Sequence, residues 1–554
     1  VADSVGLDNG SFTGTGTFRV QKKTAGGFTV GGASTFVSDA GLGKLTGGFY
    51  NVEIGAKDYV GTATINTIST GKLPAYTSIL TKGALSVTGT VNGGATDTLV
   101  LHGEGGLTQT APIKVGNLLL LGKGTVALDG VANNEIGNIA ADMSTGVLKL
   151  KNQTDMKVDK IQDRTVTPAA DVDGIAAKST EIHLGIGKKL DVRSNIKTTD
   201  DAKLEADKMD LGSKVDIGKQ LTLEKADKNS AVNIGTGGDW DGLNNSKYEK
   251  IKIGGNGQSG NINIAGTTFK NPSDIETTGN VKLTGTNKAG ADGKSDMTIT
   301  ANTAELPTNA DSLAVKNLTL NLSGGIDLGN GKVHGAEGGN IKVGNVPTGK
   351  DIVISDNASD AAAGDFRISY RTINDTLDGF KGFDVAGDQH VYFYGGAVKK
   401  SLIVAGKEGV VVKDNVSITG DGTKFVVGTE LSTNPGVARA ATNITNGGFT
   451  VESGKSVTLD GKNAKLSINV DQDVTLENNA HIFVKGRDSL VKGDGIDTNV
   501  VVASHNGNLV LNNSATLEVV SGKPVHVDVN ANKVKLDAGA QLNSGNDTDG
   551  ALRV

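Results

Sequence analysis

Apolar and polar residues alternate one by one along most of this chain, in short runs. Examples are "LTLEK" at 221–225, "LTLNL" at 318–322 and "VTLDG" at 457–461. Each run is about four or five residues long, apolar on one face and polar on the other, and such runs are ended by Gly, Asn or Asp, which predicts short β-strands with one buried face. The spacing of three and four residues that marks a helix is nearly absent. The pattern therefore predicts an all-β protein made of many short strands.

The short runs recur at close and regular spacing, most clearly in the C-terminal third. Three such strands make a coil of roughly 20 to 26 residues, a period that indicates a solenoid. A β-sandwich usually has longer strands and packs aromatic residues between two sheets, whereas aromatic residues make up only 4% of this chain. We predict a parallel β-helix (β-solenoid), continuous over residues 1–554, with roughly 25 coils at ~4.8 Å each, an elongated rod. The apolar pairs behind this prediction include Val457/Leu459, Leu466/Ile468, Val474/Leu476 and Ile482/Val484.

One run departs from the alternation, because four leucines follow one another from Leu118 to Leu121. A membrane span would need about twenty apolar residues, and a helix would need apolar partners at helical spacing. We therefore predict a strand with Leu118 and Leu120 on one face and Leu119 and Leu121 on the other. A strand that is apolar on both faces is expected where a loop covers its outer side.

Composition fits a narrow core with many corners. The chain has 79 Gly, 8 Pro and 36% hydrophobic residues. Glycine adopts positive φ at little cost, which the corners of a coil require. Cys is absent, which excludes disulfides, thiolate metal sites and cysteine nucleophiles.

The charges are spread without blocks, and the formal net charge is −6. A nucleic-acid-binding protein would concentrate its basic residues in a stripe, so we expect no nucleic-acid partner. No apolar stretch is long enough to span a membrane, and no signal peptide opens the chain. The abrupt start at Val1 is typical of a processed product or of a piece of a longer protein.

Residues 105–150 contain, in order, "GLTQT", "NLLLLGKGTVAL", "ANNEIGNIAA" and "GVLKL". This stretch resembles the repetitive body of filamentous-haemagglutinin-like exoproteins of two-partner secretion systems; the rest of the chain is similar only in style. The resemblance implies a right-handed β-helix that is exported through an outer-membrane pore and serves as an adhesin, a biofilm-matrix protein or a toxin-delivery stalk. The family's secretion domain usually carries Asn-Pro-Asn, whereas this chain has only "NPG" at 434–436. The secretion domain is therefore not expected in this segment, or the chain is an autotransporter passenger or another β-solenoid surface protein.

Residues 365–396 hold seven of the chain's 21 aromatic residues, so we predict an aromatic-rich loop or excursion from the coils over 355–400. Aromatic faces stack on sugars, and a rigid scaffold commonly carries such a binding loop. The alternative, which we favour, is a local core beneath a loop or a wider coil. Trp240, the only tryptophan, is either a binding tip or part of a loop packed on the coils. The candidate ligand-binding residues are Arg367, Tyr370, Arg371, Phe380, Phe383, Tyr392, Tyr394 and Trp240.

Catalytic and metal sites are not expected. The carboxylate pairs Asp171/Asp173 and Asp471/Asp473 lack the further ligands of a calcium loop, and we interpret them as solvated turns. The seven His residues are scattered, so we expect no metal, no cofactor and no catalytic residue. A polysaccharide-cleaving enzyme remains an alternative, since successive coils could place two carboxyl groups about 5–10 Å apart.

These features favour a non-catalytic secreted or cell-surface protein that acts as an adhesin or an extended stalk. Its expected partners are a glycan or protein receptor on a host or bacterial surface, and an outer-membrane secretion pore during export. A self-assembling extracellular filament or biofilm-matrix protein, which would bind itself end to end at open strand edges, is the first alternative. The polysaccharide-cleaving enzyme is the second.

Overall fold

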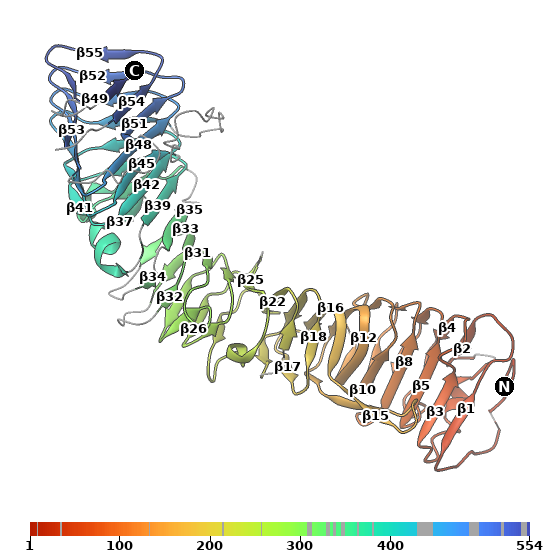
Figure 1. Ribbon diagram of the computed structural model, residues 1–554. Helices are drawn as coiled ribbons and strands as arrows, with labels where there is room; N and C mark the ends of the chain where they lie inside the picture. Colours follow the sequence, from red (N-terminus) through yellow and green to blue (C-terminus); the bar gives the residue numbers. More distant parts are fainter. Residues whose placement is uncertain are drawn as a thin grey trace. The chain divides into compact units, whose positions relative to one another are not determined.

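The computed structural model is built almost entirely of short β-strands stacked in parallel ladders (Figure 1). It forms two compact units, Val1–Thr277 and Thr278–Val554, which we call unit 1 and unit 2. The predicted class, an all-β parallel solenoid, is confirmed. The described residues are 1–554 without 8, 34–35, 132, 213–214, 256, 307–312, 328–332, 336–338, 345–348, 363–364, 379, 381, 429–446, 487–497, 522–525 and 544–550.

In unit 1 a long ladder places like residues above one another. Ile54, Ile79, Leu101 and Leu120 pair in register from coil to coil and are almost completely buried. This stacking explains how a chain with few aromatic residues fills its core, since a narrow interior needs one aliphatic side chain per coil at each position. The ladder consists of β1 (Thr17–Val20), β3 (Asn51–Gly55), β5 (Tyr76–Thr81), β8 (Thr98–Gly103), β10 (Ile113–Leu121) and β12 (Glu135–Asn152).

The outer side of this ladder is covered by an antiparallel hairpin, β14 (Lys160–Asp163) and β15 (Ala170–Asp173). We call residues 160–173 the strap. Its Ile161 and Val172 pack against Tyr76, Val100, Leu119, Leu121 and Ala140. Leu118 and Leu120 point into the coil, so the predicted division of the four leucines between two faces is confirmed. Strands β5 and β8 are buried along their whole length for the same reason.

In unit 2 each regular coil contributes one strand to each of three sheets. Residues 401–419 show the repeat, with β42 (Ser401–Gly406), β43 (Gly409–Val412) and β44 (Val416–Thr419). Rings Phe393, Phe425 and Phe449 meet edge to face in the interior, with centroids 5.9 and 6.2 Å apart. The sheet that contains β43, which we call sheet F, has the order β37, β36, β40, β43, β46, β49, β52, β55.

The aromatic-rich segment adds a strand to sheet F outside the regular repeat. After β36 (Ile352–Ile354), the chain forms β37 (Phe366–Ile368) on one side of β36, while β40 (His390–Phe393) lies on the other side. Between β37 and β40 lie the π-helical turn η3 (Thr372–Thr376), β38 (Leu377–Asp378) and β39 (Gly382–Gly387). This insertion places Phe366, Tyr392 and Phe393 at one end of sheet F, whereas Phe383 lies on β39 in the large sheet.

The last described coil of unit 2 contains exposed leucine side chains. It consists of β55 (Val534–Leu536), β56 (Gln541–Asn543) and β57 (Ala551–Arg553), and each is the last strand of its sheet among the described residues. Leu536 is 49% exposed and Leu552 is 43% exposed. The helices in the described part of the chain are too short and too polar to cross a membrane.

Candidate functional site

Four of the eight candidate ligand-binding residues lie in the interior. Trp240 is 0% exposed, Tyr370 and Phe383 are 2% exposed, and Phe380 is 4% exposed. Their ring faces are covered by protein and are not available to stack on a ligand. For these residues the structure favours the interpretation as local core.

Tyr370 is held in this core by its ring and by its hydroxyl group. The hydroxyl donates a hydrogen bond of 2.5 Å to the main-chain carbonyl of Tyr394. The ring lies against Gly396, where an added Cβ would come within 2.3 Å of it. Burial raises the pKa of the Tyr370 hydroxyl far above its usual range, because the phenolate would lose its hydration. Tyr370 therefore acts as a core residue that needs a glycine as its neighbour.

Trp240 lies in unit 1, where its loop packs back onto the coils. It starts β24 (Trp240–Asp241) and pairs in register with Met209 and Ile234. Its indole Nε1 donates to the carbonyl of Ala206 at 3.3 Å. Next to it, Lys225 Nζ lies 3.2 Å from Asp239 Oδ2, and Lys225 is buried.

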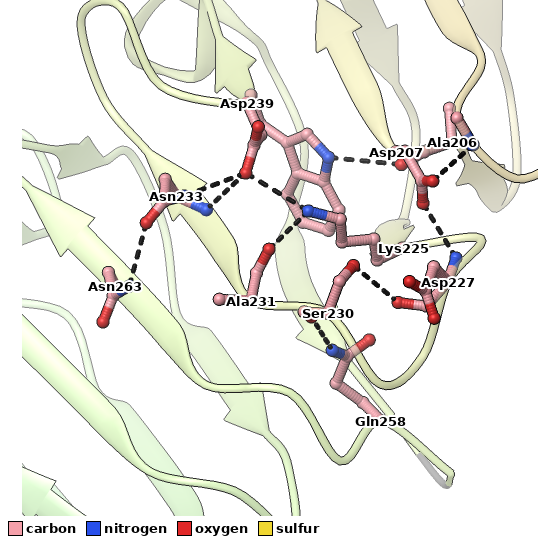
Figure 2. A network of polar contacts seen from close by, with 12 residues as sticks. Ala206, Asp207, Lys225, Asp227, Ser230, Ala231, Asn233, Asp239, Gln258 and Asn263 are labelled. Atoms are coloured by element: carbon pink, nitrogen blue, oxygen red, sulfur yellow. Dashed lines mark hydrogen bonds and ion pairs between the residues drawn. The ribbon is translucent and has the colours of Figure 1, made fainter.

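Figure 2 shows the polar network that contains Lys225 and Asp239. Lys225 and Asp239 are directed toward each other, and Lys225 also donates to the carbonyl of Ala231. The Asp239 carboxylate accepts further hydrogen bonds from the main-chain and side-chain nitrogens of Asn233. Lys225, Asp239 and Asn233 thus form hydrogen bonds with one another and with the main chain, and these bonds hold the loop against the coils.

The other four candidates reach the surface of unit 2. Arg367 is exposed and donates to the carbonyls of Ser355 and Asp356, both at 3.3 Å. Arg371 is exposed, and its main-chain nitrogen donates to Asp356 at 3.1 Å. Tyr392 and Tyr394 are partly exposed.

Tyr392 stands on the outer face of β40 between two basic side chains. The His390 ring is stacked on it with a centroid distance of 5.3 Å and an interplanar angle of 16°. Lys413 Nζ lies 4.8 Å from the centre of the Tyr392 ring and 3.4 Å from Glu452. Burial, and then the charge of Asp351, raise the pKa of Tyr392, so its hydroxyl is a neutral donor near neutral pH.

A groove of about 420 Å³ begins at His390 and follows the outer face of sheet F. Its floor includes Gly409 and Gly448, which follow His390 in register on β43 and on β46 (Gly448–Val451). At both steps an added Cβ would approach a main-chain oxygen of the next coil, that of Gly448 at 3.1 Å or that of Asp473 at 2.7 Å, so glycine allows the coils to stack closely here. The polar groups along the groove are Glu408, Thr450, Asp471, Gln472, Asp473, Thr475 and Asn506.

Asp471 and Asp473 therefore line this groove. The interpretation of the pair as solvated turns did not predict a groove at this place. Asp473 Oδ1 accepts hydrogen bonds from the main-chain nitrogen of Asn508 at 2.7 Å and from its side-chain amide at 3.2 Å. Asp473 thus fixes the turn of the next coil as well. The other pair, Asp171/Asp173, lies exposed on the strap, where Asp173 accepts from Asn195 at 3.0 Å.

Sequence reasoning missed Glu408, Gln472 and Asn506, because they are far apart in the chain. The available signal was the glycine at the start of the strands "GVVV" and "GFTV", which marks a close approach of neighbouring coils. As it stands, the groove offers carboxylate, amide and hydroxyl groups next to an aromatic face. These are groups that bind the hydroxyls and the apolar faces of sugars.

Within the described residues, no three His, Asp or Glu side chains are grouped so as to hold a metal ion. Comparisons of the chain with models of protein families, with curated proteins and with solved structures find no match.

Proposed function

We propose that this protein is a non-catalytic adhesin, secreted or displayed on a cell surface, and that unit 2 binds a receptor glycan in the groove on sheet F. The observation that carries the proposal is the combination at one place of the Tyr392 ring, the His390 ring and the polar groove. Stacked parallel coils supply a rigid surface for such a site, and binding groups on rigid elements keep their geometry. Export through an outer-membrane pore belongs to the same proposal and rests on the resemblance of residues 105–150.

The charges of the groove define the class of glycan. Glu408, Asp471 and Asp473 line it, so an acidic glycan would meet repulsion from carboxylates. A neutral glycan can donate its hydroxyl hydrogens to the same oxygens while an apolar part of a sugar contacts the exposed edge of the Tyr392 side chain. We therefore propose a neutral glycan as the ligand, carried by a surface polysaccharide or a glycoprotein.

The test is binding of the purified chain to a panel of neutral, sialylated and sulfated glycans. We expect Tyr392→Ala and Glu408→Gln to weaken binding of a neutral glycan at least about tenfold, a loss of about 1.4 kcal/mol. The double change Tyr392→Ala and Tyr394→Ala should abolish binding and leave the fold intact, because Tyr370 bonds to the main chain of Tyr394. Binding of acidic glycans alone, or equal binding by all variants, would contradict the proposal.

Unit 2 offers a matched control. On β50 (His481–Gly486) the ring of Phe483 is stacked on His481 at 5.4 Å and 21°, the same arrangement as His390 and Tyr392. Phe483 lies in a different sheet from the groove. Phe483→Ala should therefore keep full glycan binding.

A second candidate function is end-to-end self-assembly, in which strand edges of two copies would pair. The exposed side chains of Leu536 on β55 and Leu552 on β57 would contribute apolar contacts to such an assembly. Sedimentation at rising protein concentration tests it, with Leu552→Lys expected to suppress growth of the assemblies. A mass that does not change with concentration would exclude it.

The polysaccharide-cleaving enzyme is the remaining alternative. Glu408, Asp471 and Asp473 are the carboxyl groups that it would use. Release of reducing ends from any polysaccharide of the panel would overturn the non-catalytic proposal.

A further inference from the structure

The strap connects strands of five successive coils in unit 1. Its residues contact β12 through Ala140, β10 through Leu119 and Leu121, β8 through Val100 and β5 through Tyr76. Its tip reaches the start of β3, where Arg164 Nη1 donates to the carbonyl of Tyr50 at 2.7 Å. The strap is thus a separate layer placed across stacked strands (Figure 1).

An arginine clamp holds the tip of the strap. The guanidinium of Arg164 lies 4.4 Å from the ring centre of Tyr50 and 4.5 Å from that of Tyr76. The Tyr76 hydroxyl donates to the carbonyl of Gln162 and accepts from the main-chain nitrogen of Arg164 at 3.2 Å. Burial raises the pKa of Tyr76 to about 12, so this hydroxyl stays protonated at any physiological pH. None of these clamp contacts changes charge between neutral and mildly acidic pH.

His102 lies on the covered face of β8, in a place that suits only a neutral ring. It is 8% exposed and pairs in register with Leu80 and with Leu121, which belongs to the cluster under the strap. Neither ring nitrogen has a hydrogen-bond partner among the described residues. A protonated ring needs two acceptors, and a buried charge without them is costly.

Three charged groups act on His102 from the elements around it. Lys57 follows β3, Glu104 follows β8, and Asp163 is on the strap. Asp163 accepts from the main-chain nitrogen of Thr165 at 2.8 Å, and its other oxygen is 3.6 Å from Lys57. The carboxylate nearest on the strap is therefore already engaged, and Lys57 adds a repulsive charge to a protonated His102.

We propose that the strap is a pH-gated cover, closed while His102 is neutral and released when the ring takes up a proton. Release lets water reach the imidazolium and uncovers the apolar strip formed by Tyr76, Val100, Leu119 and Leu121. An exposed apolar strip of this kind is a typical contact surface. The inference concerns unit 1 and does not depend on glycan binding in unit 2.

The direction of the pH effect follows from the burial of the ring. Burial, followed by the charge of Lys57, lowers the pKa of His102 below its usual value of about 6.5. The part of the free energy of closure that depends on a neutral His102 is then fully present above about pH 6.5. It is lost as the pH falls through the lower pKa of the covered ring. The strap is therefore closed at neutral pH and opens in acid.

Hydrogen exchange of the whole chain, followed by mass spectrometry of peptides covering 160–173, tests this inference. After correction for the intrinsic pH dependence of exchange, we expect protection of the strap to fall at least about tenfold between about pH 7.5 and about pH 5. In His102→Leu the ring is replaced by a side chain that suits its leucine neighbours, and the loss of protection should disappear. His102→Gln, a second variant without a titrating ring, should behave in the same way.

The matched control is His183→Gln, which removes a histidine of the same unit whose ring meets two carboxylates at the outer face. This variant should keep the pH response of the strap. Equal protection of the wild-type strap at both pH values would overturn the inference. So would an unchanged pH response in both His102 variants, which would assign the response to a carboxyl group.

Discussion

The Tyr370 hydroxyl donates a hydrogen bond to the main-chain carbonyl of Tyr394, at 2.5 Å. This contact joins two residues of the same aromatic-rich segment that have different roles. Tyr370 is buried beneath the segment, whereas the side chain of Tyr394 is partly exposed at its surface. Aromatic residues close together in the sequence are thus divided between a core and a surface.

Removal of Tyr370 should destabilise unit 2 and removal of Tyr392 should not. Tyr370→Ala empties a buried aromatic site, so we expect the free energy of unfolding to fall by about 3–5 kcal/mol. Tyr370→Phe keeps the ring but leaves the carbonyl of Tyr394 without its donor, a loss of about 1–2 kcal/mol. Urea denaturation measures both, with Tyr392→Ala as the control, expected to change stability by less than about 1 kcal/mol. Equal losses for Tyr370→Ala and Tyr392→Ala would contradict this division.

The strap makes an outward leucine part of the core. Leu119 faces away from the coil interior and is 0% exposed, so Leu119→Ala should cost about 2–4 kcal/mol of unfolding free energy in unit 1. The matched control is Val510→Ala on β52 (Leu509–Leu511), because Val510 also faces outward but is partly exposed. It should cost less than about 1 kcal/mol. A negligible effect of Leu119→Ala would mean that the strap does not cover it.

His183 should make unit 1 slightly more stable at mildly acidic pH. Its Nδ1 lies 3.2 Å from Glu205 and its Nε2 lies 2.7 Å from Glu181. The hydrogen bond to Glu205 is the largest cause that raises the pKa of His183. The stabilising contribution is therefore fully present below the usual pKa of about 6.5 and is lost as the pH rises through the raised value.

NMR titration of the His183 ring checks this shift directly. The midpoint should lie above that of an exposed histidine, and Glu205→Gln should lower it. The loss of stability on raising the pH should be at most about 1 kcal/mol, because the pair is near the surface. His183→Gln should remove this part of the pH dependence, and a midpoint below about 6.5 would contradict the prediction.

Trp240 provides a probe of unit 1 because it is the only tryptophan in the chain. It is 0% exposed, so iodide should scarcely quench its fluorescence until unit 1 unfolds. Lys225→Met removes the cation between Asp239 and the Ala231 carbonyl and leaves the carboxylate without its charged partner. We expect a loss of about 2–4 kcal/mol in unit 1 and earlier exposure of Trp240 in urea. Strong quenching of the native protein would show instead that Trp240 lies at a binding tip.

The prediction of strands was reliable because alternation has a direct physical cause. In a short strand with one buried face, apolar and polar residues must alternate. Stacking of such strands in register requires only that an aliphatic residue recurs once per coil. The aromatic residues were harder to place. Seven of them in 366–394 indicated either a ligand site or a core, and the sequence could not decide which rings the extra strand β37 and its neighbours would cover. Tyr370 was covered and Tyr392 was not, although both belong to the same segment.

The groove could not be predicted from the sequence, because it forms only when the coils are stacked. His390, Gly409, Gly448 and Asn506 are separated by tens of residues, and only the parallel register makes them neighbours.

The sequence by itself determined the fold class of this protein and the two-faced character of the strand at Leu118–Leu121, because periodicity and burial act on neighbouring residues. Only the tertiary structure decided what covers the outer face of that strand, which aromatic rings remain accessible, and that His102 is buried beside Leu121 with no hydrogen-bond partner among the described residues. These features depend on which coils meet and where the strap lies across them. Such contacts join residues far apart in the chain, and their pairing leaves no local period in the sequence.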